Sequence, residues 1–181
     1  AIPGAREHGL FVRPIEAFTQ LWSRMAELGR ERALCVVVVG GGAAGVELAL
    51  AIHHTLGERS HVSLVTGGGV PLPSHPPSVQ RRALKALKRR NVTVLEDTCA
   101  EISAEHVLLG RGTRVACDAA VVALGAAAPA WLHGSGLALD ERGFVATGPT
   151  LQSSSHPEVF AAGDVATRSD DPHPKSGVYA V

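Results

Sequence analysis

The sequence predicts an α/β fold: a Rossmann-like, doubly wound parallel sheet into which a small antiparallel β-meander is inserted. Three observations support this class. Short apolar runs alternate with longer segments of helical periodicity, as they do in βαβ units. The first apolar run, residues 34–39, ends in a glycine-rich turn that leads directly into a helical segment. Residues 100–115 form short alternating runs broken by Gly110 and Gly112, which is typical of hairpins.

The N-terminal part of the chain predicts one helix. Residues 1–13 show no periodicity and are predicted to be irregular. From Pro14 onward, apolar side chains recur at spacings of three and four as far as Gly29, where a helix would stop. The recurring residues are Ile15, Phe18, Trp22, Met25 and Ala26. This helix is predicted to pack on the domain that follows.

The remaining elements follow in βαβ order. Residues 34–39 are rich in valine and predict a strand buried on both faces, as in a parallel sheet. Residues 43–56 are small and apolar throughout and predict a buried helix that ends at Gly57. Residues 78–90 predict a helix with one apolar side and many cations. Further strands are predicted over residues 61–66, 91–95, 119–124, 143–147 and 159–162.

Composition places the chain among ordinary globular proteins. Of its 181 residues, 45% are hydrophobic and 19% are charged, a balance that argues against wholesale disorder. Lys+Arg and Asp+Glu both number 17 and there is no basic tail, so we predict no nucleic-acid partner. No apolar run approaches the roughly 20 residues that span a bilayer. The first residues lack a signal-peptide pattern, and we expect a cytoplasmic fragment trimmed from a longer protein.

The cysteines and histidines predict no metal site. Cys35, Cys99 and Cys117 are widely spaced and form no CxxC pair, which predicts three reduced thiols and no redox dithiol. His53 and His54 are adjacent, so they do not share a helix face as ligands at i and i+4 do. We therefore name no metal ligand.

Gly40, Gly42 and Gly45 form a G-x-G-x-x-G pattern between a predicted strand and a predicted helix. In that context the pattern predicts a dinucleotide site. Gly40 permits the tight turn, Gly42 lets the pyrophosphate approach the backbone, and Gly45 lets the helix pack closely on the sheet. The N–H groups of Ala43 and Ala44 and the positive end of the helix dipole then face the phosphates. The alternative is a tight turn that binds no ligand.

The end of the next predicted strand bears on the choice of nucleotide. An acidic residue that would bind a ribose hydroxyl is absent there, and the strand ends at Thr66 and Gly67. Thr66 could donate or accept one hydrogen bond. No arginine stands there to bind a 2′-phosphate, so NADH is favoured over NADPH, although both stay open. Glu47, predicted in the first turn of the helix, is either a carboxylate favoured by the helix dipole or a residue near the nicotinamide carboxamide or flavin edge.

Taken together, these motifs resemble the pyridine nucleotide–disulfide oxidoreductase superfamily over roughly residues 34–181. The motifs are GGGAAGVE at 40–47, the basic helix, ALG at 123–125, GFV at 143–145 and PEVFAAGD at 157–164. The segments 128–132, 135–137, 150–153 and 173–181 are similar to one branch, the NADH dehydrogenase-like flavoproteins. Some members of that branch are fused to selenide, water dikinase.

The resemblance implies an FAD domain that is split by an inserted NAD(P)H domain. Residues 1–33 would then be a linker and packing helix, 34–148 the NAD(P)H-binding Rossmann-like domain, and 149–181 the return segment of an otherwise absent FAD-binding domain. Gly163 and Asp164 match the pair that contacts the ribityl–pyrophosphate region of FAD, and residues 177–181 match the start of a helix near the flavin ring. The family's usual Ala-Thr-Gly turn has Leu124 in place of threonine, which loses a hydroxyl contact but keeps Gly125 for close approach.

The function implied by the resemblance is that of an FAD-dependent NAD(P)H dehydrogenase. A hydride would pass from NADH to FAD, and electrons would then pass to a small acceptor such as a quinone. Because the cofactors carry this chemistry, we assign no catalytic residue. The implied partners are NAD(P)H, the absent FAD domain and the acceptor, and we expect the chain alone to bind FAD poorly.

Two alternatives stay open. The basic helix at 78–90 is either a solvated face or a contact with an anionic membrane, which would make the protein peripheral to that membrane. The whole chain could also be a non-catalytic dinucleotide sensor or interaction module with the same fold.

Overall fold

The computed structural model describes residues 2–13, 15–173 and 175. Pro14 and residues 177–181, for which the sequence made predictions, lie outside the described residues. The chain forms two compact units, Ala1–Leu124 and Gly125–Val181. The assignment of residues 34–148 and 149–181 to nucleotide and flavin domains stays a prediction.

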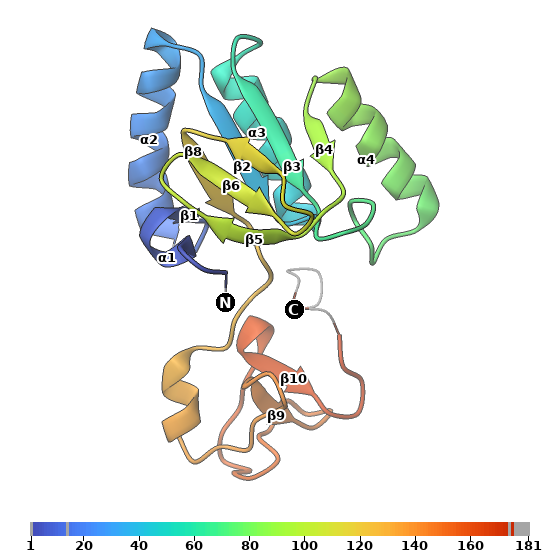
Figure 1. Ribbon diagram of the computed structural model, residues 1–181. Coiled ribbons are helices and arrows are strands. Elements are labelled where there is room, and N and C mark those ends of the chain that lie inside the picture. The colour runs from blue at the N-terminus through green and yellow to red at the C-terminus, as the bar shows by residue number, and fades with distance from the viewer. Residues whose placement is uncertain (1, 14, 174, 176–181) are drawn as a thin grey trace. The chain divides into compact units, whose positions relative to one another are not determined.

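The first unit is built around a five-stranded sheet in which every pairing is parallel (Figure 1). In spatial order the strands are β1 (Gly9–Phe11), β8 (Ala119–Val122), β2 (Cys35–Val39), β3 (His61–Val65) and β4 (Thr93–Leu95). From β2 the chain winds through β3 to β4, and it then returns to place β8 on the other side of β2. The winding direction therefore reverses at β2. In open α/β sheets, the crevice at the carboxyl ends of the strands at such a reversal is where ligands bind.

Alternate residues of the strands face two separate cores, because successive side chains of a strand point to opposite faces. On one face, helices α2 (Ile15–Glu31), α3 (Ala43–Leu56) and α4 (Pro77–Arg89) complete the core. A row of side chains in register across all five strands faces this core: Leu10, Val121, Val38, Leu64 and Val94.

The opposite face of the sheet is covered by the antiparallel meander. Its strands are β5 (Cys99–Ile102), β6 (His106–Leu109) and β7 (Arg114–Ala116), and the short helix α1 (Ala5–His8) packs in the same core. Val39 and Val65 face this core, whereas their neighbours Val38 and Leu64 face the helices. A strand that is buried on both faces reads as a continuous apolar run, which is why β2 is five apolar residues long.

This architecture confirms the predicted α/β, Rossmann-like class and its meander, which forms the layer on the second face of the sheet. The strands and helices between residues 34 and 124 end within two residues of their predicted bounds. None of the helices in the described part of the chain combines the length and apolar character that crossing a bilayer requires.

Two predictions for the N-terminal part are wrong. Residues 1–13 are not irregular, because they form α1 and the edge strand β1, which pairs with β8. Helix α2 does not stop at Gly29 but continues to Glu31. A Cβ atom at Gly29 would lie 2.6 Å from Cδ2 of Leu56, so this glycine allows α2 to approach α3.

The second unit has little regular structure. The parallel strands β9 (Val145–Thr147) and β10 (Ala166–Arg168) are accompanied by two single turns, η1 (Ala130–Gly134) and η2 (Gly163–Val165). Its buried side chains include Leu132, Phe144 and Thr147. The predicted strand over residues 159–162 is wrong: Phe160 makes a single bridge to Gln152 and its side chain is 64% exposed. The strand that pairs with β9 begins at Ala166, after the η2 turn.

Candidate dinucleotide site

The turn that follows β2 lies between the carboxyl ends of β3 and β8. Gly40 has φ 134°, a backbone conformation open to glycine and strained for other residues. Its N–H donates to the carbonyl oxygen of Val65 at 2.9 Å. A Cβ atom at Gly40 would lie 2.4 Å from the carbonyl oxygen of Ala123, which follows β8. The turn therefore stands at the point where the winding of the sheet reverses.

The other two glycines of the pattern have different surroundings. A Cβ atom at Gly45 would lie 1.7 Å from the carbonyl oxygen of Gly40, so the first turn of α3 packs directly on the glycine turn. A Cβ atom at Gly42 would meet nothing within 4 Å, so this position faces open space. The geometry agrees with the predicted close packing at Gly45, whereas a ligand at Gly42 stays a prediction.

The first turn of α3 presents backbone donors to that open space. The first helical hydrogen bond runs from the N–H of Val46 to the carbonyl oxygen of Gly42 at 3.1 Å. The N–H groups of Ala43, Ala44 and Gly45 precede it and have no acceptor inside the helix. Gly42 is the N-cap residue, and no side chain caps it. Free N–H groups at the positive end of a helix dipole favour an anion such as a pyrophosphate.

Thr66, at the end of β3, is available only as a hydrogen-bond acceptor. Its Oγ1 donates to the carbonyl oxygen of Gly69 at 2.5 Å and lies 3.3 Å from that of Leu95. A hydroxyl has one hydrogen, and carbonyl oxygens cannot donate, so this hydrogen is used within the protein. Beside it, the N–H of Gly67 donates to the carbonyl oxygen of Asp97 at 2.9 Å.

The loop between β3 and α4 is hydrogen-bonded to the glycine turn, a contact that the sequence did not predict. The N–H of Leu72 donates to the carbonyl oxygen of Gly41 at 2.7 Å. Leu72 is buried with φ 62°, a conformation that costs an L-residue roughly 1–2 kcal/mol. Nε2 of Gln80 donates to the carbonyl oxygens of Leu72 at 3.1 Å and His75 at 3.0 Å. The signal in the sequence was Leu72 between two prolines, followed by a glutamine in the next helix.

Glu47 does not lie in the first turn of α3. The helix begins at Ala43, and its first turn contains no acidic residue. Because the dipole effect falls off within the first turn, the electrostatic explanation for Glu47 loses its basis. Its side chain is exposed, and its placement near a nicotinamide stays a prediction.

The predicted site residues are divided between the two units. The glycine turn, Thr66 and Gly67 gather in the first unit, whereas Gly125, Gly163 and Asp164 belong to the second. Gly125 opens the second unit, and a Cβ atom there would meet nothing within 4 Å. Gly163 has φ 74° and begins η2, which also holds the half-buried Asp164.

A polar cluster in the second unit connects Asp140 to Lys175. The carboxylate of Asp140 accepts the hydroxyl of Thr167 at 2.7 Å and the N–H groups of Arg142 and Phe144, both at 2.9 Å. Burial raises the pKa of Asp140, but these hydrogen bonds outweigh it, and the net shift of the pKa is downward. Lys175 donates to Oγ1 of Thr167 at 2.7 Å and lies 4.4 Å from the ring centroid of Phe144. Burial lowers the pKa of Lys175.

The cysteines are free thiols. Burial, with a smaller contribution from Asp118, raises the pKa of Cys117 to about 11. Burial also raises the pKa of Cys99. A thiol with a raised pKa is protonated at neutral pH and is a poor nucleophile. Among the residues that the structure describes, no group of three or more His, Cys, Asp or Glu side chains is placed to hold a metal ion.

Comparison with known proteins gives one family and several relatives. The family model described as pyridine nucleotide-disulphide oxidoreductase matches residues 1–181. Over 175 residues the chain is 27% identical to demethylphylloquinone reductase NdbB of Synechocystis sp., covering 93% of this chain and 43% of that protein. Over 150 residues it is 27% identical to the type II NADH:quinone oxidoreductase of Haemophilus influenzae, covering 75% of this chain and 34% of the relative.

Among solved structures, NDH2 from Plasmodium falciparum in complex with NADH has a TM-score of 0.77 at 16% identity. The match covers 92% of this chain and 41% of that one, and at this identity it shows a shared fold. The chain therefore spans less than half the length of each of these proteins.

Proposed function

The chain belongs to the pyridine nucleotide-disulphide oxidoreductase family, and we propose that its first unit binds the pyridine nucleotide. One observation carries the proposal. At the reversal of the winding, a turn with open space at Gly42 leads into a helix whose first N–H groups have no internal acceptor. This arrangement suits the pyrophosphate of NADH, which would accept from the N–H groups of Ala43, Ala44 and Gly45.

The state of Thr66 supports NADH over NADPH. Because its hydroxyl hydrogen is used by Gly69, Oγ1 of Thr66 can only accept. The ribose 2′-hydroxyl of NADH can donate to it. The 2′-phosphate of NADPH presents charged acceptor oxygens in the same place, and two acceptors repel. The chain's own contribution is thus to bind and orient the nucleotide.

For a longer protein that contains this chain, we propose oxidation of NADH with FAD as the immediate acceptor and a quinone as the final one. NADH and FAD supply the hydride and electron chemistry when they are bound. The names of two relatives, a demethylphylloquinone reductase and an NADH:quinone oxidoreductase, support the quinone. In the second unit, the carboxylate of Asp164, with Gly163 beside it, would accept hydrogen bonds from ribityl hydroxyls of FAD. Gly125 would allow the cofactor to approach the backbone.

Calorimetric titration with NADH and with NADPH tests the nucleotide site. We expect NADH to bind more tightly than NADPH. Gly42→Ala adds one methyl group in the open space that the pyrophosphate would occupy, and it should weaken NADH binding by at least about tenfold, or 1.4 kcal/mol. Gly134→Ala is the matched control, because its added methyl group also meets nothing within 4 Å but lies in the second unit. If the Gly42→Ala chain bound NADH as tightly as the wild type, the pyrophosphate could not lie at this turn.

A further inference from the structure

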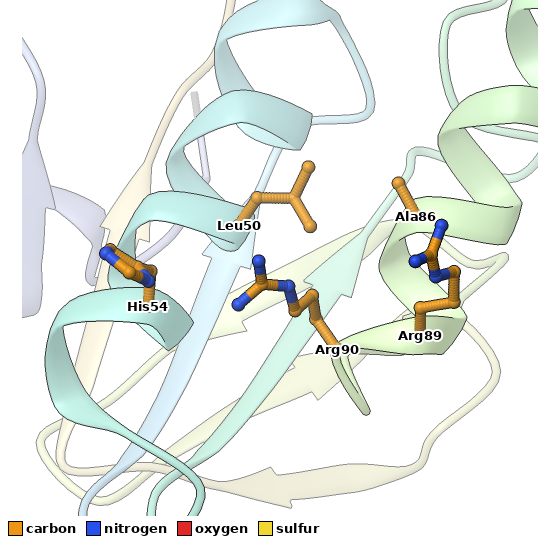
Figure 2. Close-up of a pocket in the computed structure, with 5 residues that line it drawn as sticks. All are labelled: Leu50, His54, Ala86, Arg89 and Arg90. Atoms are coloured by element: carbon orange, nitrogen blue, oxygen red, sulfur yellow. The ribbon is translucent and has the colours of Figure 1, made fainter.

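A pocket of about 520 Å³ lies between α3 and α4 in the first unit (Figure 2). Pockets for small molecules have volumes of roughly 300–1,000 Å³, so its size suits a small ligand. Figure 2 shows the side chain of Arg90 extending from the end of α4 into the space between the two helices. The residues that line it are Leu50 and His54 of α3 and Ala86, Arg89 and Arg90 of α4 and its C-cap.

The pocket lies at the end of α3 that is remote from the glycine turn. His54 follows Gly45 by nine residues. At a helical rise of 1.5 Å per residue, the two positions are about 13 Å apart along the axis. The pocket is therefore separate from the proposed nucleotide site.

The arginines of this pocket are not needed to end the helix. The backbone N–H of Arg90 donates to the carbonyl oxygens of Ala86 and Leu87, and the N–H of Asn91 donates to that of Lys88 at 3.1 Å. Asn91 has φ 51°, so the helix ends in a left-handed cap that satisfies its last carbonyl groups. Among the residues that the structure describes, the guanidinium groups of Arg89 and Arg90 have no hydrogen-bond or ion-pair partner.

Helix α4 carries a concentrated positive charge. Neither α4 nor its C-cap contains an acidic residue. Within the part of the chain that the structure describes, no cation of this helix forms an ion pair. The six exposed cations are Arg81, Arg82, Lys85, Lys88, Arg89 and Arg90.

The apolar side of α4 is already used. Leu87 is fully buried, and Val79 and Ala83 pack against the same core. The helix consequently has no free apolar face to insert into a lipid bilayer. A ligand in this pocket would meet the charged side chains of Arg89 and Arg90 and the small apolar surface of Leu50 and Ala86.

We propose that the pocket binds a phosphate group carried by a small organic molecule or by a lipid headgroup. The guanidinium group of Arg90, which extends between the helices, presents a planar fork of N–H donors that matches two oxygens of a phosphate. Arg89 lines the same pocket beside Ala86 and adds a second positive charge. His54 lines the pocket from the facing helix, and its imidazole can donate through one ring nitrogen. Leu50 and Ala86 contact the carbon atoms next to the phosphate. A dianion with three terminal oxygens can use this set of donors, whereas a carboxylate has only two oxygens to offer.

Amide NMR titration of the full chain with inorganic phosphate, with chloride keeping the ionic strength constant, tests the pocket. We expect saturable shifts in residues 50–54 and 86–91, unchanged by saturating NADH. R89Q/R90Q should weaken phosphate binding by at least about tenfold, the loss of 1.4 kcal/mol or more. R81Q/R82Q, which removes the same charge from the same helix outside the pocket, should leave the affinity unchanged.

Three outcomes would overturn the proposal: no saturable shift in these residues, equal losses in the two double variants, or loss of the shifts when NADH is added. The first means that no site exists, the second that diffuse charge alone attracts the ion, and the third that phosphate reports the nucleotide site. R90K keeps the charge but removes the fork, so we expect an intermediate loss of phosphate affinity. The amide spectrum of each variant reports its folding.

Two further arms distinguish the sources of the phosphate group. Glycerol 3-phosphate is the soluble probe, and phosphatidylcholine vesicles doped with phosphatidic acid are the membrane probe, with undoped vesicles as the control. Binding of glycerol 3-phosphate alone assigns a soluble ligand. Sedimentation with doped vesicles that R89Q/R90Q abolishes and R81Q/R82Q does not assigns a headgroup. Sedimentation that both variants reduce equally would contradict a pocket-based contact.

Discussion

At the scale of single residues, Gly45 sets how closely α3 approaches the turn after β2. The Cβ atom of an alanine there would lie 1.7 Å from the carbonyl oxygen of Gly40, so the backbone would have to move. We expect Gly45→Ala to lower the free energy of unfolding by roughly 1–3 kcal/mol, the usual cost of overpacking. Urea denaturation followed by circular dichroism measures this change.

Gly42→Ala is the comparison for that experiment. Gly42 has φ −75°, which alanine adopts readily, and its added Cβ atom would meet nothing. Its stability should change by less than about 1 kcal/mol, the scale of an N-cap substitution. Equal stabilities of Gly45→Ala and Gly42→Ala would show that α3 does not pack closely on the turn.

The three glycines of the pattern also show how much of the site the sequence could predict. The conformation of a short strand-to-helix turn depends on the spacing of its own residues. The sequence alone could therefore assign the tight turn to Gly40, the open position to Gly42 and the close helix packing to Gly45. The state of Thr66 could not be predicted, since it depends on where the carbonyl oxygen of Gly69 lies. The contact of Leu72 with Gly41 depends on the path of a whole loop in the same way.

Asp118, which directly precedes β8, makes polar contacts with β2 and with the residue that follows α2. Its carboxylate pairs with Arg32 at 2.8 Å and accepts the N–H of Cys35, the first residue of β2, at 2.8 Å. The hydrogen bond from Arg32, helped by that from Cys35, lowers the pKa of Asp118. Asp118→Asn weakens both contacts. We expect it to destabilise the chain by about 1 kcal/mol at neutral pH, the usual worth of a hydrogen bond to the backbone.

The sign of the pH dependence follows from the lowered pKa. The contribution of Asp118 is fully present above the pKa of an unfolded aspartate, about 3.9, and is lost as the pH falls through the lower pKa of the folded state. The difference in unfolding free energy between wild type and Asp118→Asn should therefore be larger at about pH 7 than at about pH 3. Urea denaturation of both proteins at the two pH values measures it. A difference that is constant with pH would mean that the charge of Asp118 contributes nothing.

At the scale of elements, the length and periodicity of a segment decide how well its sequence predicts it. Helix α3 and strands β2 and β3 are long enough for their patterns to be unambiguous. Strand β1 has three residues and is held by pairing with β8, more than a hundred positions later. Residues 159–162 are apolar enough for a strand but have only a single bridge as a partner, whereas Ala166–Arg168 pairs with β9. Such pairings depend on tertiary structure that a local pattern does not contain.

Leu87 is the buried side chain of helix α4. The side chain of Leu87 is fully buried, whereas that of Leu84 on the same helix is only half-buried. We expect Leu87→Ala to destabilise the first unit by roughly 2–5 kcal/mol, and Leu84→Ala to cost clearly less, because it leaves no enclosed cavity. Thermal and urea denaturation of the two variants measure the difference. Similar losses would mean that α4 packs through its whole apolar side.

At the scale of the whole molecule, the division into two units predicts that the nucleotide site is independent of the second. The glycine turn, Thr66 and both cores of the sheet lie within Ala1–Leu124. Strand β8 closes the sheet between β1 and β2, and the N–H of Ala123 still donates to the carbonyl oxygen of Val39 at 2.9 Å. A chain that ends at Leu124 should therefore fold cooperatively and bind NADH with unchanged affinity.

A chain that ends at Ala116 is the matched control for this prediction, because it lacks β8 and leaves β1 and β2 without their common partner. It should fail to fold, as shown by circular dichroism and a loss of cooperative unfolding. NADH titration of the chain ending at Leu124 then decides the question. If that chain is folded but binds NADH at least about tenfold more weakly than residues 1–181, then the second unit supplies contacts to the nucleotide worth 1.4 kcal/mol or more. Unchanged binding assigns the nucleotide to the first unit alone, and leaves Gly125, Gly163 and Asp164 to a second ligand.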